Sequence, residues 1–178
     1  DTSLEKCAAK EFSDFTSRLK YREFYSAVNG GIEKNCYSVS NHTLVSRTIY
    51  DLGITFFNHR EFLWKAVWKK LDADRIVLAY SPITYWDDDW QFPVDLTNAV
   101  RSSMLIYVDF QRLPEVSGFA QTKMKVFFQF NLGGNVPIAY LNKQIPSRLT
   151  SWLEDVRVYF NKSLEIDCSK NAAFVEKI

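Results

Sequence analysis

The sequence predicts an α+β fold, in which a curved antiparallel sheet wraps around a long C-terminal helix and a shorter helix lies at the N-terminus. Two observations predict it. Apolar residues recur at helical spacing near both ends of the chain, and between these ends about six segments carry β-rich sequence bounded by turns. Because helices do not alternate with strands, a βαβ arrangement is excluded.

The first predicted helix covers residues 3–19. Ser3 is a suitable N-cap residue, and apolar side chains then recur every three or four positions, at Leu4, Ala8, Phe12, Phe15 and Leu19. A weaker segment over residues 21–28 ends at Asn29-Gly30-Gly31, a strong turn sequence.

Three β-hairpins are predicted next. The paired segments are 36–39 with 44–52, 62–71 with 75–80, and 100–110 with 119–132. In the last pair, apolar side chains alternate with more polar ones, so that Met104, Ile106 and Val108 share one face. This alternation indicates an antiparallel sheet with one buried face and one face in water.

The final predicted helix follows Gly133-Gly134 and runs from Pro137, a residue suited to a first helical turn, to about Phe160. Its apolar stripe consists of Ile138, Leu141, Ile145, Leu149, Trp152, Val156 and Phe160. At 1.5 Å per residue, a helix of this size spans about 36 Å, the width of a small sheet.

Composition narrows the class of protein. The 178 residues are 47% apolar and carry a net charge of +1, which excludes disorder and disfavours nucleic acid as a partner. The chain contains 14 Phe, 9 Tyr and 5 Trp. Aromatic side chains either fill a dry core or line a cavity for an apolar ligand, and composition leaves both alternatives open.

Neither a catalytic nor a metal site is predicted. The two histidines, His42 and His59, have no evident nucleophile partner, and no phosphate-binding glycine loop occurs. Cys7, Cys36 and Cys168 lack zinc-site spacing. They favour free thiols in a reducing compartment, with one disulfide and a spare thiol as the alternative. We therefore expect a non-enzymatic protein without a cofactor.

Several motifs, taken in order, resemble the START family, the lipid-transfer domains related to steroidogenic acute regulatory protein. The similarity covers roughly residues 44–160. Its motifs are Asn58-His59-Arg60-Glu61-Phe62-Leu63, Val67-Trp68-Lys69-Lys70-Leu71-Asp72-Ala73-Asp74, Phe92-Pro93, Ala99-Val100-Arg101 and Phe130-Asn131-Leu132-Gly133-Gly134-Asn135-Val136-Pro137.

The resemblance implies a helix-grip fold that encloses one lipid, a phospholipid or a sterol, in an internal cavity. It implies a lipid-binding domain over residues 1–162, lacking the family's first strands, and a C-terminal tail over residues 163–178. A protein of this kind is expected to be a cytoplasmic monomer that makes transient peripheral contact with membranes.

The resemblance also assigns ligand-facing positions. By alignment these are Ala66, Met104, Ile145, Trp152, Val156 and Phe160. Strand alternation adds Trp64, Trp68, Ile106, Val108, Met124, Val126 and Phe128 to the same interior. The two strand tryptophans either pack the sheet or form an aromatic wall for a choline-type cation.

Two further features belong to the expected site. Arg47 is either a surface strand residue or an inward-facing group that binds an anionic head, in which case burial demands a partner. The segment Gly53-Ile54-Thr55-Phe56-Phe57-Asn58 matches a START loop thought to open at the membrane. Ile54, Phe56 and Phe57 are the expected contact residues, with the two phenylalanines either folded inward or available to a bilayer.

The sequence thus predicts a lipid-binding domain that transfers or senses its ligand at membranes. The alternative is a regulatory or protein-interaction module, in which the helix-grip has collapsed into a packed core. A third interpretation, an enzyme that uses the same cavity, requires a polar cluster inside it.

Overall fold

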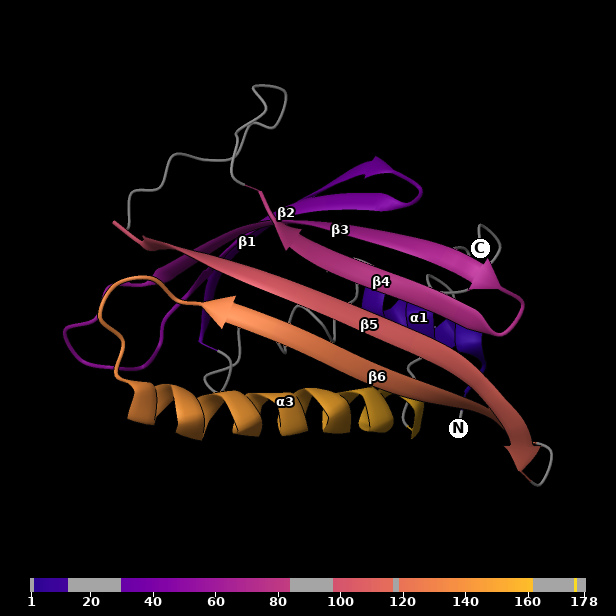
Figure 1. Cartoon of the computed structure of the whole chain (residues 1–178). Helices are drawn as coiled ribbons and strands as arrows, with labels where there is room; N and C mark the ends of the chain where they lie inside the picture. Colours follow the sequence, from indigo (N-terminus) through magenta and orange to yellow (C-terminus); the bar gives the residue numbers. More distant parts are fainter. Residues whose placement is uncertain (1, 13–29, 84–97, 117–118, 162–174, 176–178) are drawn as a thin grey trace.

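Six strands and two helices make up the part of the chain that the computed structural model describes, which is residues 2–12, 30–83, 98–116, 119–161 and 175 (Figure 1). Helix α1 comes first and helix α3 last, with all strands between them. The elements are α1 (Leu4–Phe12), β1 (Gly31–Ser40), β2 (Thr43–Tyr50), β3 (Arg60–Asp72), β4 (Arg75–Pro82), β5 (Val100–Val116), β6 (Phe119–Asn131) and α3 (Ile138–Asn161).

The strands form one sheet in sequence order, and each strand pairs antiparallel with its neighbours. The three predicted hairpins are confirmed. Strands β1, β3, β4 and β5 are longer than expected, whereas β2 and β6 are each one residue shorter. Because β4 pairs with β3 only as far as Trp64, the start of β3 is left to pair in parallel with the start of β5, over Arg60↔Val100 to Phe62↔Ser102. This places the motif residues Glu61 and Arg101 side by side.

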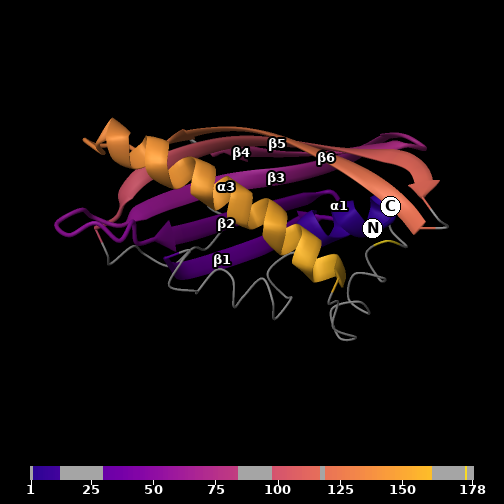
Figure 2. The same cartoon turned by 90° about the horizontal axis from the view of Figure 1, so that it is seen from below.

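Both helices lie on the concave face of the curved sheet, and α3 crosses that face (Figure 2). The predicted α+β class and its helix-grip architecture are therefore confirmed. A tight turn between β6 and α3 depends on Gly133, whose φ is 65°. A Cβ atom there would lie 2.8 Å from the Arg101 carbonyl oxygen, so the turn requires glycine.

Several expectations fall outside the described residues. They are the second half of the first predicted helix, the segment 21–28, the Phe92-Pro93 motif and all but one residue of the tail 163–178.

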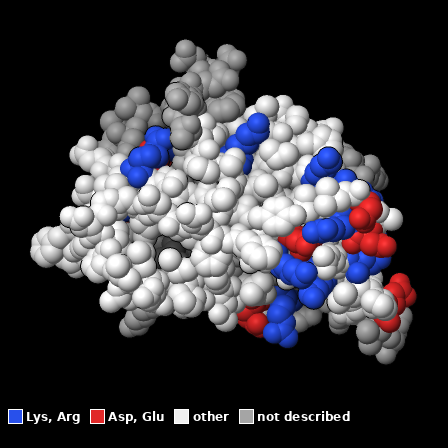
Figure 3. All heavy atoms as spheres, in the orientation of Figure 1, with Lys and Arg blue, Asp and Glu red and all other residues white. Residues whose placement is uncertain are grey.

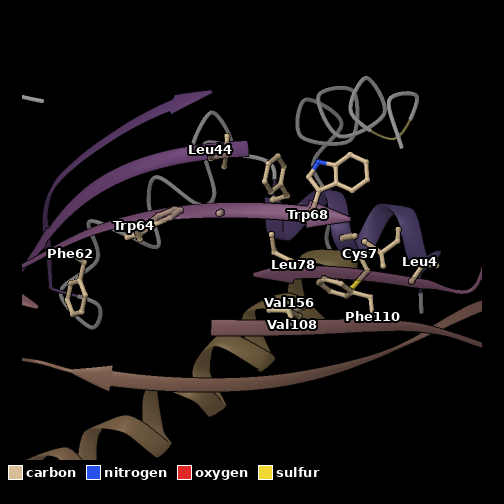
Figure 4. Close-up of a cluster of buried hydrophobic side chains, with 14 residues drawn as sticks. Leu4, Cys7, Leu44, Phe62, Trp64, Trp68, Leu78, Val108, Phe110 and Val156 are labelled. Atoms are coloured by element: carbon tan, nitrogen blue, oxygen red, sulfur yellow. The ribbon is translucent and has the colours of Figure 1, made fainter. Parts of the chain in front are cut away.

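The packed core lies where α1 meets the sheet. Leu4, Cys7 and Phe12 of α1 are buried against apolar side chains of the concave face, among them Leu78 and Phe110. Figure 4 shows Leu4, Cys7, Leu78 and Phe110 at one end of the buried apolar cluster, whereas Phe62 and Trp64 lie at the other end.

Candidate functional site

A cavity of about 350 Å³ lies between the concave face and α3, next to the packed core. Most of its lining is apolar or aromatic: Phe12, Leu44, Tyr50, Leu52, Phe62, Trp64, Tyr80, Met104, Ile106, Phe130, Leu132, Tyr140, Leu141, Ile145 and Trp152. Five lining residues are polar or charged: Lys10, Glu11, Lys34, Gln144 and Asp155. Its size and composition are those of a small-molecule site.

Aromatic rings form the sheet wall of the cavity. The rings of Trp64 and Tyr80 meet edge to face at 5.2 Å, and the ring of Phe62 lies 5.8 Å from Tyr50 and 6.2 Å from Phe130. These contacts join β2, β3, β4 and β6 on one face. The wall is therefore preformed, because edge-to-face ring contacts stabilise one arrangement of the side chains.

Helix α3 forms the opposite wall. Tyr140, Leu141, Ile145 and Trp152 of this helix line the cavity. The Tyr140 hydroxyl donates a hydrogen bond to the Leu52 carbonyl oxygen. This bond joins the first turn of α3 to the segment between β2 and β3, at one end of the cavity.

The other end of the cavity carries a polar cluster centred on Glu11. The Lys10 ammonium lies 3.1 Å from the Glu11 carboxylate, and both side chains are buried. The second Glu11 carboxylate oxygen accepts the Trp152 indole N–H at 3.0 Å, and the Glu11 backbone carbonyl accepts the Tyr80 hydroxyl at 3.2 Å. The cluster thus fastens α1 to both α3 and the sheet.

Titration of this cluster is perturbed. Burial raises the pKa of Tyr80 well above its usual value, and Glu11 adds to the shift. Burial also raises the pKa of the Asp155 carboxyl, with Lys10 opposing the shift and Glu11 adding to it. The charged forms of both groups are therefore disfavoured relative to water.

The structure divides the expected ligand-facing residues into two groups. Trp64, Met104, Ile106, Ile145 and Trp152 line the cavity. Ala66, Trp68, Val108 and Val156 lie instead in the packed core, and Met124, Val126 and Phe160 pack against it. Phe128 belongs to neither group, and its ring lies 5.3 Å from that of Phe130.

The two strand tryptophans have different surroundings. The Trp68 ring lies 6.4 Å from Phe12 and 4.3 Å from His42, and its indole N–H donates to the Asn41 carbonyl at 2.8 Å. It packs the sheet. Trp64 lines the cavity, and the Lys34 ammonium lies 5.4 Å from the centre of its ring.

Arg47 is buried, but away from the cavity. It is 1% exposed and lies on the convex face of β2, where its guanidinium donates to the carboxylates of Glu61 and, at 2.9 Å, Glu33. Arg101 also binds Glu61, at 2.7 Å. Neither alternative describes Arg47 fully, because the side chain is buried but does not line the cavity. Strand alternation explains it, since the neighbouring Leu44 and Tyr50 face the cavity from even positions.

The segment between β2 and β3 exposes one of its two phenylalanines. Phe56 is 100% exposed and has a φ of 69°, a left-handed conformation that is rare for a bulky residue. Ile54 and Phe57 are half-buried, and the Phe57 N–H donates to the Ile54 carbonyl at 3.1 Å. Ile138, at the start of α3, is 73% exposed at the same end of the molecule.

The outer surface differs between the two ends. Charged side chains gather near the β3–β4 turn, where Arg112 binds both Glu5 and Asp74 and Arg75 binds Asp109 (Figure 3). The end that carries Phe56 and Ile138 is largely uncharged in this view, and the surface is hollowed between β6 and the start of α3.

Sequence reasoning missed many of the lining residues. Phe62 and Phe130 could have been found, because each shares a strand face with an expected residue. Lys10, Glu11 and Asp155 could not, since charged residues on amphipathic helices normally meet solvent. Within the described ranges no cluster of His, Cys, Asp and Glu could hold a metal ion, and no helix is long and apolar enough to span a membrane.

The strands and helices that the structure describes form a START-like helix-grip fold. Human StAR-related lipid transfer protein 5 superposes with a TM-score of 0.66 at 16% identity, over 90% of this chain and 73% of that one. A STAR-related lipid transfer protein from Xanthomonas axonopodis superposes with a TM-score of 0.59 at 12% identity, over 90% and 81%. No family model and no curated protein sequence matches the chain.

Proposed function

We propose that this chain binds one lipid molecule in the cavity and transfers or senses it at membranes. The observation that carries the proposal is the cavity itself, about 350 Å³ between an aromatic sheet wall and a helix that stands off from it. Similarity to the fold of two proteins whose names include lipid transfer supports the same function.

Binding would be non-covalent. An apolar ligand gains about 25 cal/mol for each Å² of apolar surface that it removes from water. The polar lining groups nearest to one another, Lys10 and Glu11, already satisfy each other, which favours binding over catalysis. A ligand would enter when α3 and the segment 51–59 move away from each other. The hydrogen bond between Tyr140 and Leu52 joins these two elements and would have to break in that movement.

Membrane contact would occur at the uncharged end of the molecule. Phe56 and Ile138 are large, exposed apolar side chains at this end. They belong to the segment 51–59 and to helix α3, which lie at the border of the cavity. Aromatic and aliphatic side chains of this kind insert into the interface of a bilayer.

Lipid exchange between liposomes tests this function. We expect the double variant Phe56→Asp, Phe57→Asp to slow transfer of a fluorescent lipid by about tenfold or more, since two carboxylates oppose insertion into the interface. Val39→Asp, at an exposed site on β1, is the matched control. Unchanged transfer by the double variant, with its thermal unfolding also unchanged, would remove the membrane role of this segment.

A second candidate function is a protein-interaction module, and one observation favours it. The convex face carries an apolar cross-strand row, Val67, Ala79, Tyr107 and Phe127, of which Phe127 is 61% exposed. An exposed apolar row of this kind is a usual feature of interaction surfaces. Phe127→Lys would abolish binding of a protein partner through this row and leave lipid transfer unchanged. Filling the cavity would have the opposite effect.

A further inference from the structure

We propose that Asp155 receives the polar end of the ligand, and that this end is an uncharged hydroxyl group on a compact or single-chain apolar molecule. The inference rests on the proposed function and specifies the chemical class of its ligand. It comes from an accounting of the four charged side chains that line the cavity: Lys10, Glu11, Lys34 and Asp155.

Glu11 is already satisfied. One of its carboxylate oxygens binds Lys10 at 3.1 Å, and the other accepts the Trp152 indole N–H at 3.0 Å. Its backbone carbonyl accepts the Tyr80 hydroxyl. A ligand would have to displace protein partners in order to bind this carboxylate.

Asp155 differs from Glu11 in this respect. It lines the same end of the cavity from α3, is half-buried, and makes no hydrogen bond or ion pair with any residue that the structure describes. Burial raises its pKa, which is the expected consequence of a carboxyl group with too little solvation. A ligand that donates a hydrogen bond to Asp155 would supply what the protein does not.

The surrounding charges select the kind of donor. The charges that line the cavity balance, with Lys10 and Lys34 against Glu11 and Asp155, so an ammonium group meets like charges as well as opposite ones. Lys34 already lies over the Trp64 ring that a cation would otherwise use. A carboxylate or phosphate would meet Asp155 and Glu11. An uncharged hydroxyl avoids both repulsions and still donates a hydrogen bond to a carboxylate, which is stronger than one between neutral groups.

The size of the cavity limits the apolar part. A cavity of about 350 Å³ is near the small end of ligand sites, which range over about 300–1,000 Å³. This favours a single-chain or compact ligand over a phospholipid with two acyl chains.

A matched ligand series tests the assignment. The experiment measures how well each ligand displaces a fluorescent apolar probe from the full chain. The ligands are dodecan-1-ol, dodecane, dodecanoic acid, dodecylamine and cholesterol. We expect dodecan-1-ol to bind about tenfold more tightly than dodecane, and more tightly than the acid or the amine. Whether cholesterol or dodecan-1-ol binds more tightly identifies the source of the hydroxyl.

Two variants locate the hydrogen bond. In Asp155→Leu the preference for dodecan-1-ol over dodecane should disappear, while dodecane still binds. Asp155→Asn retains a hydrogen-bond acceptor and should keep part of the preference for dodecan-1-ol. Glu154→Gln is the control, because Glu154 is an exposed neighbour on the same helix. An alcohol preference that is equal in the wild-type and Asp155→Leu proteins overturns the assignment but leaves lipid binding standing. If the wild-type protein binds no member of the series, the proposed function fails as well.

Discussion

At one end of the concave face helix α1 fills the space above the sheet, and at the other end α3 stands off and leaves a cavity. Both ends present apolar residues from alternate strand positions. Phe110 and Val108 are fully buried beneath α1, whereas Ile106 and Met104, on the same face of the same strand, line the cavity. The comparison teaches that the covering helix, and not the sheet, determines whether a strand residue belongs to a core or to a binding site.

The largest expected effect is a difference in stability between alanine variants of two phenylalanines, one at each end. Phe110→Ala should lower the free energy of unfolding by about 3–5 kcal/mol, because the residue is fully buried and its removal leaves a void. Phe130→Ala should cost only about 1–2 kcal/mol, since that ring is 36% exposed and already borders a cavity. Urea denaturation measures both. Equal losses would mean that the two ends are packed alike.

A second pair of variants adds volume instead of removing it. Ile106→Trp should fill the cavity, abolish ligand uptake and leave stability within about 1 kcal/mol of the wild type. Val108→Trp, two residues along the same face, should destabilise by about 3 kcal/mol or more, because the packed end has no space for an indole ring. Thermal unfolding and lipid uptake are the two readouts. Uptake by Ile106→Trp at the wild-type level would place the ligand elsewhere.

The smallest expected effect concerns two thiols. Burial raises the pKa of Cys7, at the packed end, to about 12, so that little thiolate forms at pH 8. Alkylation of Cys7 should therefore be very slow in the folded protein and should accelerate as the pH rises toward 12. Cys36 is only partly buried and should react faster.

Measuring these rates in a Cys168→Ser background removes the third thiol, which lies outside the described residues. Peptide mass spectrometry assigns each modification to its cysteine. Rates that are equal for Cys7 and Cys36 would contradict the tight burial of Cys7 at the packed end.

The fold could be predicted from the sequence because its signals are local. Period-2 alternation and turn residues identified the three hairpins, and helical spacing identified α3. The division between core and cavity could not be predicted in this way. Ile106 and Val108 have the same place in the alternation, and only the long-range packing of the helices over the sheet separates them.

The polar part of the site was hidden for a related reason. Lys10, Glu11 and Asp155 have the sequence pattern of exposed helical residues, and they become lining residues only because α1 and α3 meet at the end of the cavity. Arg47 was misplaced because a resemblance assigns a position along a strand more reliably than a face, and a shift of one residue reverses the face. Its partner Glu61 is itself a motif residue, and so is Arg101, which also binds Glu61 and lies beside it through the parallel pairing of β3 with β5.

The central claim is that the hollow end of the concave face holds one lipid molecule. Native mass spectrometry of the intact chain tests it most directly, after incubation with a lipid extract and removal of free lipid. We predict one bound lipid for each wild-type chain, and none for Ile106→Trp with its fold intact. A wild-type chain that remains at its bare mass, or a filled variant that binds as much lipid as the wild type, would contradict the account.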